Sequence, residues 1–161
     1  MLRRYFSIFN VLTAVLTAVS ILLFAAVPAY AEAPLKYSPD IVFTLYGMSD
    51  VKDGPDNKSR VFAPGGKVWI NLKAAGLLKN KNKKFKVQVD FAVMAEGVKE
   101  PLRKGTVIDQ EVDADGTNYI EFTVAIDLKD DIKKGRYIAE INVKDLVAGR
   151  YSKFRPPFDV K

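Results

Sequence analysis

The sequence of 161 residues contains neither cysteine nor histidine. Without these residues the chain cannot form a Ser-His-Asp or Cys-His nucleophile, a His or Cys site for zinc or copper, a His-ligated haem or a CxxC redox pair. It also forms no disulfide and has no cysteine to carry a lipid. The enzyme class that remains is a hydrolase built on carboxylates alone.

Charge is absent from a long stretch near the N-terminus. Residues 1–4 include two arginines, and the mostly apolar run 5–31 has no charged residue. Pro28 interrupts this run, and an A-x-A motif ending at Ala31 has the small residues that a signal peptidase requires. We therefore expect residues 1–31 to be a signal peptide and the protein to be periplasmic or secreted. The alternative is an uncleaved membrane anchor, because the run is long enough to cross a bilayer.

The remaining chain has a modest positive charge. The formal net charge of the whole sequence is +6, and removal of the signal peptide takes away two arginines. This excess is too small to indicate nucleic acid, and we expect no nucleic-acid partner. Residues 32–39 contain two prolines and are predicted to be an extended lead-in. Residues 40–161 are predicted to be one domain, long enough to fold around a single core without disulfides.

Apolar residues recur at every second position through this domain, and no stripe has helical spacing. The clearest strands are Phe85 to Val93, Ile120 to Ile126 and Tyr137 to Val143. Four further strands are predicted at 41–45, 68–72, 106–112 and 151–160. Turn signals separate them, including Asp53-Gly54-Pro55 and Lys134-Gly135. The pattern predicts an all-β protein, a two-sheet antiparallel sandwich of about seven strands, with a closed barrel as the alternative.

Two segments carry a family resemblance. Phe62-Ala63-Pro64-Gly65-Gly66-Lys67-Val68 resembles the entry to an early strand in bacterial immunoglobulin-like and macroglobulin-like domains. The segment from Gly135 to Asp145, with Phe158-Asp159-Val160, is similar to their final hairpin. The resemblance implies an immunoglobulin-like sandwich in an extracytoplasmic setting, with Tyr137 at the tyrosine corner. Both immunoglobulin cysteines are missing, the single tryptophan lies on a different strand, and the resemblance implies no activity.

Acidic residues repeat at every second position in one segment. In extended backbone this spacing places the carboxylates on one face, about 7 Å apart. Such a ladder is a candidate calcium site, because calcium binds carboxylate oxygens. The alternative is the solvated face of an edge strand that runs into a turn. The residues are Asp109, Glu111, Asp113 and Asp115.

A basic run precedes and enters the strand that Phe85 begins. Its members are Lys79, Lys81, Lys83, Lys84 and Lys86. On a hairpin tip these ammonium groups would attract phosphate-rich partners such as an anionic envelope polymer or lipid head groups. No acidic residue lies in the loop, so we expect no local charge pairing. Phe85 is in phase with the buried face and is not free to stack on bases. The alternative is a solubilising loop.

Trp69 is expected to point outward, because Val68, Ile70 and Leu72 alternate with it on the inward face. Tyr46 and Ile138 are also out of phase on their strands. If those strands share a sheet, the three side chains form one outer patch suited to a protein partner. The alternatives are that the loop 50–60 covers Trp69, or that a slipped register buries it.

Taken together, these features predict an exported, non-enzymatic binding or structural module of the cell envelope. Calcium is the single cofactor that the residues suggest, and membrane contact is expected only transiently, through the signal peptide. The alternatives are a carboxylate-based hydrolase on a β-sandwich and an envelope protein anchored by an uncleaved leader.

Overall fold

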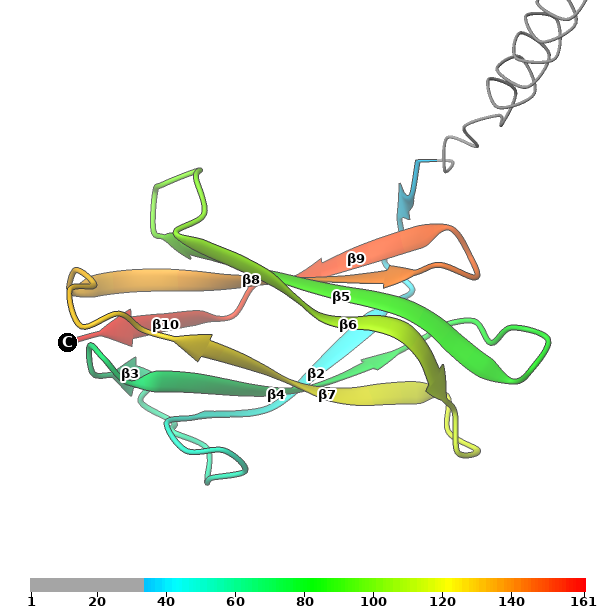
Figure 1. The fold of residues 1–161 in the computed structure, drawn as a ribbon, viewed down its shortest axis with the longest axis horizontal. Coiled ribbons are helices and arrows are strands. Elements are labelled where there is room, and N and C mark those ends of the chain that lie inside the picture. Colours follow the sequence, from blue (N-terminus) through cyan, green and yellow to red (C-terminus); the bar gives the residue numbers. More distant parts are fainter. Residues whose placement is uncertain (1–33) are drawn as a thin grey trace, which may run out of the picture. The chain divides into compact units, whose positions relative to one another are not determined.

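The computed structural model describes residues 34–161, and the predicted signal peptide lies outside the described residues. The described part is all-β and contains no helix. A seven-stranded sheet packs against a three-stranded sheet, and most strand pairs are antiparallel (Figure 1). The sandwich predicted from the sequence is therefore confirmed. Pro34–Lys161 forms one compact unit with its own core, which is what a segment needs to fold independently.

The three-stranded sheet has the order β2-β4-β7. These strands are β2 (Val42–Ser49), β4 (Lys67–Ala75) and β7 (Tyr119–Asp127). Strand β4 alternates strictly, and its inward residues, beginning with Val68 and Ile70, are fully buried. In β2 a bulge between Leu45 and Gly47 shifts the pairing with β4 by one residue. Met48 is consequently buried in the core, which the alternation at 41–45 alone did not predict.

The larger sheet is built around β8 (Gly135–Asp145). On one side lie β5 (Lys84–Ala95) and then the edge strand β6 (Arg103–Asp113). On the other side lie β9 (Arg150–Phe154) and β10 (Pro157–Val160). Two short strands extend this side in parallel, β1 (Lys36–Tyr37) beside β9 and β3 (Val61–Phe62) beside β10.

Strands β9 and β10 were expected to be one strand, 151–160. They pair with β8 in one continuous register, Phe154 opposite Ile141 and Pro157 opposite Ile138. The strand is interrupted at Arg155 and Pro156, since a proline has no N–H to donate to the ladder. Strands β1 and β3 were not predicted, because two residues are too few to show a periodicity.

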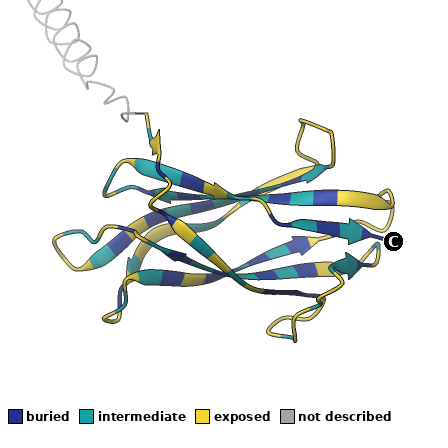
Figure 2. Cartoon of the chain, turned by 180° about the vertical axis from the view of Figure 1, so that it is seen from behind, coloured by how far each residue is buried: buried dark blue, intermediate teal, exposed yellow. Residues whose placement is uncertain are grey.

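The core fills the space between the inner faces of the two sheets, and buried and exposed residues alternate along the strands in Figure 2. Tyr137 is 2% exposed, and its ring stacks on Phe158 at 5.7 Å between centroids. Its hydroxyl donates to the backbone carbonyl of Lys133. This is the bond of a tyrosine corner, so the position inferred for Tyr137 is confirmed.

The two ends of the sandwich carry different loops (Figure 1). At the end where the described chain begins, which we name the entry end, lie the turns 76–83, 114–118 and 146–149. At the opposite end, named the groove end, lie the connections 96–102 and 128–134. Strand β8 runs between them, and from the first to the last of its 11 residues, at a rise of about 3.3 Å per step, it spans roughly 33 Å.

A buried ion pair holds the entry end together. Asp145 is fully buried and accepts hydrogen bonds from the backbone N–H groups of Leu78 at 2.9 Å and of Val147 and Ala148 at 3.1 Å each. The Arg150 Nε atom lies 3.3 Å from the same carboxylate. One side chain thus joins the turn after β4 to the turn after β8.

Candidate functional site

The three off-phase apolar residues do not form one patch. Trp69 lies on the outer face of the three-stranded sheet, opposite Ser49 and Ala125. Tyr46, on β2 of the same sheet, is 51% exposed. Ile138, however, lies on β8 of the other sheet. Because the outer faces of the two sheets point in opposite directions, the predicted common patch is wrong.

The surroundings of Trp69 decide between the alternatives for it. The register is not slipped, because the neighbouring inward residues of β4 are fully buried. Trp69 itself is half-buried, and Ser49 beside it is 1% exposed. A Cβ atom at Gly54 would lie 3.6 Å from the Ser49 Cβ, so the loop 50–60 lies over this part of the face. The Tyr46 hydroxyl donates to Glu121 at 3.0 Å. These contacts reduce the aromatic area free for a partner.

The lysine run is divided between a free tip and paired members. Lys81 and Lys83 are exposed at the tip, where the Asn80 side chain accepts from the backbone N–H of Lys84 at 3.0 Å. Lys84 forms an ion pair of 3.0 Å with Asp113 on β6, and the hydrogen bond in that pair raises the pKa of Lys84. The expectation of no local pairing was therefore wrong. It counted acids only within the loop, whereas the β5–β6 register brings them from another strand.

The same register accounts for the acidic ladder. Asp109, Glu111 and Asp113 face outward on β6, opposite Gln88, Lys86 and Lys84 respectively. Glu111 also accepts a hydrogen bond of 2.8 Å from the Asn80 side chain. Asp115 lies in the following turn with a φ of 40°. Among residues 34–161 no group of three acidic side chains is arranged to hold a metal ion, so the calcium site gains no support. The ladder and the lysine run face each other across two strands.

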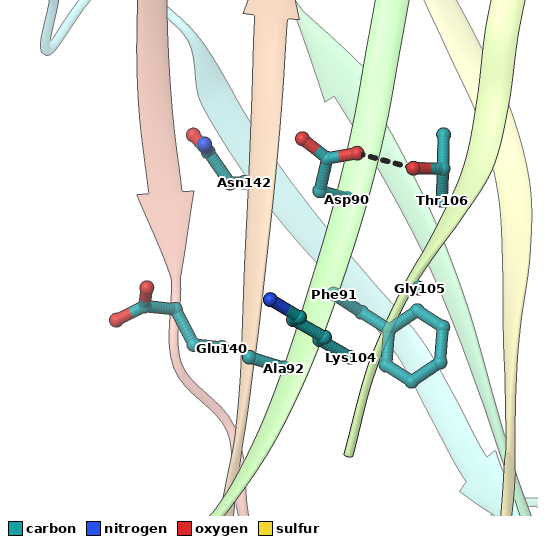
Figure 3. A pocket seen from close by; sticks show the side chains of 8 residues that line it. All are labelled: Asp90, Phe91, Ala92, Lys104, Gly105, Thr106, Glu140 and Asn142. Atoms are coloured by element: carbon teal, nitrogen blue, oxygen red, sulfur yellow. Dashed lines mark hydrogen bonds between the residues drawn. The ribbon is translucent and has the colours of Figure 1, made fainter. Parts of the chain in front are cut away.

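A shallow depression of about 490 Å³ lies on the outer face of the larger sheet (Figure 3). It forms where Gly105 allows β6 to pass close to Phe91, since a Cβ atom there would lie 2.8 Å from the Phe91 ring. Asp90 accepts from the Thr106 hydroxyl at 2.8 Å and pairs with Lys144 at 2.8 Å. Burial raises the pKa of Asp90, but these hydrogen bonds outweigh burial and bring it below its usual value.

The depression does not have the arrangement of a hydrolase. Its second carboxylate, Glu140, is paired with Lys153 at 2.9 Å and Arg155 at 3.5 Å, and it points away from Asp90 in Figure 3. A glycosidase-type pair needs one carboxyl group with a raised pKa, facing its partner across the substrate. Asp90, with its lowered pKa, is the opposite of such a group.

A larger hollow, a groove of about 870 Å³, lies at the groove end. This volume is within the roughly 300–1,000 Å³ typical of small-ligand sites. The groove lies between the two sheets, where the ends of β5 and β7 and the start of β8 meet the two connections of this end. Its floor consists of side chains that are at most 4% exposed: Val93, Ile126, Leu128 and Tyr137.

The edges of the groove combine apolar and charged side chains. Val98 and Leu102, from the connection after β5, are 48% and 58% exposed. The connection after β7 contributes the lysines, and among the described residues none of the three has an ion pair. They are Lys129, Lys133 and Lys134. Asp131, also in the lining, has no ion pair within residues 34–161 either.

Hydrogen bonds hold the groove open in this shape. Arg103 on β6 donates to the Asp127 carboxylate at 2.8 Å and to the Asp127 carbonyl at 3.1 Å, which joins the edges of the two sheets. A hydrogen bond from Lys67 lowers the pKa of Asp127, with Arg103 adding to the effect. On the other wall, the Tyr137 hydroxyl fixes the carbonyl of Lys133. The groove is thus formed before any ligand arrives.

The sequence did not reveal this groove. Its lining comes from segments at 93–103 and 126–137, which are about 30 residues apart in the chain. The available signal was the charge-rich segment Lys129 to Arg136 between two apolar strands, which was interpreted only as a turn. Its meaning depends on the apolar floor beneath it.

Within residues 34–161 there is no helix with the length and apolar character needed to cross a bilayer. No protein-family model matches the sequence, and no curated protein matches it significantly. Solved structures resemble the fold at low identity. The alkylpurine DNA glycosylase AlkC of Pseudomonas fluorescens, bound to DNA with an abasic-site analogue, is 12% identical with a TM-score of 0.49. That match covers 76% of this chain but 30% of the glycosylase.

Two further structures match over most of both chains. An immunoglobulin-like protein from Pseudomonas aeruginosa is 12% identical over 81% of this chain and 99% of its own, with a TM-score of 0.41. A superoxide reductase (neelaredoxin) from Ignicoccus hospitalis is 11% identical over 78% of this chain and 95% of its own, with a TM-score of 0.40. These similarities carry no argument about activity. The chain is an all-β sandwich with a weak immunoglobulin-like resemblance.

Proposed function

We propose that this protein is an exported, non-enzymatic binding module of the cell envelope and that the groove is its binding site. The observation that carries the proposal is an apolar floor of buried side chains beneath an edge with three lysines that have no ion pair within residues 34–161. The preformed walls mean that binding would not have to order the loops first, which favours affinity.

The chemistry of the groove indicates the type of ligand. The apolar floor and Leu102 suit a hydrocarbon or aromatic group, while Lys129, Lys133 and Lys134 suit a negative charge at the edge. A small amphiphile that combines an apolar body with an anionic group meets both conditions. The proposal of export rests on residues 1–31, whose charge pattern is that of a signal peptide.

The test uses 1-anilinonaphthalene-8-sulfonate, a fluorescent probe with an aromatic body and a sulfonate. We expect it to bind residues 32–161 with increased emission and to be displaced by dodecanoate. The variant Leu102→Glu places a negative charge at the groove edge and should weaken binding at least ten-fold.

Val42→Glu is the matched control, because Val42 is also 58% exposed but lies on the three-stranded sheet. Binding that is unaffected by Leu102→Glu, or equally weakened by both substitutions, would refute the groove as the site. Thermal unfolding of both variants verifies that they are folded.

A further inference from the structure

The entry end has exposed apolar side chains from three separate segments. Tyr37 is 62% exposed, Leu78 52% and Val147 38%. The segments are held together, since Asp145 binds the backbone N–H groups of Leu78 and Val147, and the Tyr37 ring lies 5.9 Å from that of Tyr151. These side chains therefore belong to one rigid end of the domain and do not lie on independent flexible loops.

Free positive charge lies at the same end. The tip of the turn after β4 presents Lys81 and Lys83, which form no ion pair within the described chain. The bridge between Lys79 and Phe85 attaches this turn to β5, and the bond from Leu146 N–H to the Lys86 carbonyl attaches the start of β5 to the turn after β8.

Acidic groups at this end are largely engaged. Asp113 pairs with Lys84, and both Asp145 and Asp40 pair with Arg150. Glu111 accepts a hydrogen bond from the Asn80 side chain. Glu111 and Asp115 have no ion pair within residues 34–161. The net charge of the entry end is positive because its basic residues, Lys36, Lys79, Lys81, Lys83, Lys84, Lys86 and Arg150, outnumber its acids, Asp40, Glu111, Asp113, Asp115 and Asp145.

The chain also enters the domain here. Pro34 is the first described residue, and Lys36 and Tyr37 pair with β9 beside the turn after β8. The uncharged run 5–31 is therefore attached at this end.

We propose that the entry end docks on an anionic lipid surface. Leu78, Val147 and Tyr37 enter the interfacial layer, where tyrosine and short apolar side chains are stabilised. Lys81 and Lys83 contact the phosphates of the head groups. A soluble anionic polymer would use the lysines but would gain nothing from the exposed apolar side chains at the same end, and for this reason a lipid surface fits the end better.

This inference does not depend on the groove. It changes the expectation of a merely transient membrane contact, because the sequence did not show that Leu78, Val147 and Tyr37 belong to the same end of the domain. With the entry end on the membrane, the groove would be roughly 33 Å away and open toward the opposite side.

The experiment measures co-sedimentation of residues 32–161 with phosphatidylcholine vesicles that contain or lack phosphatidylglycerol. We expect binding only to the anionic vesicles, with affinity that decreases as salt increases. Lys81→Gln with Lys83→Gln should weaken binding about 25-fold, which is roughly five-fold for each lysine. Leu78→Ser with Val147→Ser should weaken it by a similar factor.

The matched control, Lys52→Gln with Lys58→Gln, removes the same charge from the exposed loop 50–60, outside both the entry end and the groove lining, and should leave vesicle binding unchanged. An equal loss in this control would show that binding reflects net charge alone and would overturn the proposal. Full binding by the Leu78→Ser, Val147→Ser variant, with complete competition by soluble polyphosphate, would instead identify a polymer site. Absence of binding to anionic vesicles at low salt would also overturn the proposal that the entry end docks on a lipid surface.

Discussion

Removal of the buried carboxylate at Asp145 is expected to destabilise the domain more than any change to its surface charges. The side chain is fully buried and accepts hydrogen bonds from three backbone N–H groups and from Arg150. In Asp145→Ala all four donors lose their acceptor, and the Arg150 side chain, 19% exposed, keeps a charge without its buried partner.

The size of the effect follows from this geometry. Breaking a buried ion pair by removing one partner costs about 3–5 kcal/mol. Leu78 and Val147 lie on exposed turns, where water can replace part of what is lost, so we expect the lower end, about 3 kcal/mol. For a domain of this size that lowers the thermal midpoint by roughly 10 °C. Asp145→Asn loses the charge and replaces one acceptor oxygen by an NH2 group that faces N–H donors, so it should cost nearly as much as Asp145→Ala.

Urea unfolding of residues 32–161 measures the free energy, and an unchanged m-value shows that the same surface is exposed on unfolding. The control is Asp113→Ala, which removes an exposed ion pair with Lys84 and should cost less than about 1 kcal/mol. If Asp145→Ala loses no more than this control, the carboxylate does not hold the two turns together and the reasoning fails.

Three further predictions concern separate parts of the chain. Protein recovered from the periplasm or medium should have the intact mass of a chain that begins at Glu32, whereas a full-length mass in the membrane fraction would show a retained anchor. Acrylamide should quench Trp69 fluorescence less readily than that of free tryptophan but more readily than that of a core indole, because the Trp69 side chain is half-buried. Quenching equal to that of free tryptophan would show that the Trp69 side chain is not partly covered. Because the pKa of Asp90 is lower in the folded protein, the ionised side chain stabilises the fold at pH values above the unfolded pKa of about 4, and this stability is lost as pH falls through the folded pKa. Asp90→Asn should therefore reduce the drop in thermal midpoint between neutral pH and about pH 3. An identical drop in both proteins would contradict this.

Local patterns were sufficient for the strands that have one buried face. In the predicted ranges Phe85 to Val93, Ile120 to Ile126 and Tyr137 to Val143 each inward residue is buried, and the alternation that predicts this lies within a single strand. The outward direction of Trp69 followed in the same way, whereas the role of Tyr137 was implied by the resemblance to immunoglobulin-like domains. The bulge after Leu45 and the two-residue strands β1 and β3 were not predicted, because they have no repeating pattern.

Properties that depend on which strands are neighbours were decided only by the tertiary structure. Alternation shows that Ile138 points outward, but the assignment of β8 to the opposite sheet from Trp69 comes from pairing between distant segments. The same pairing places the acidic ladder opposite the start of β5 and joins Lys84 to Asp113 in an ion pair.

The two sites proposed here are also products of tertiary structure. Leu78 and Val147, far apart in the chain, meet because one buried carboxylate binds both of their turns. The groove forms because the ends of β5 and β7, which belong to different sheets, face each other across the core. By itself the sequence determined which side chains face inward along each strand, since that depends on backbone geometry alone. Which exposed side chains come together depends on contacts between segments that no local pattern records.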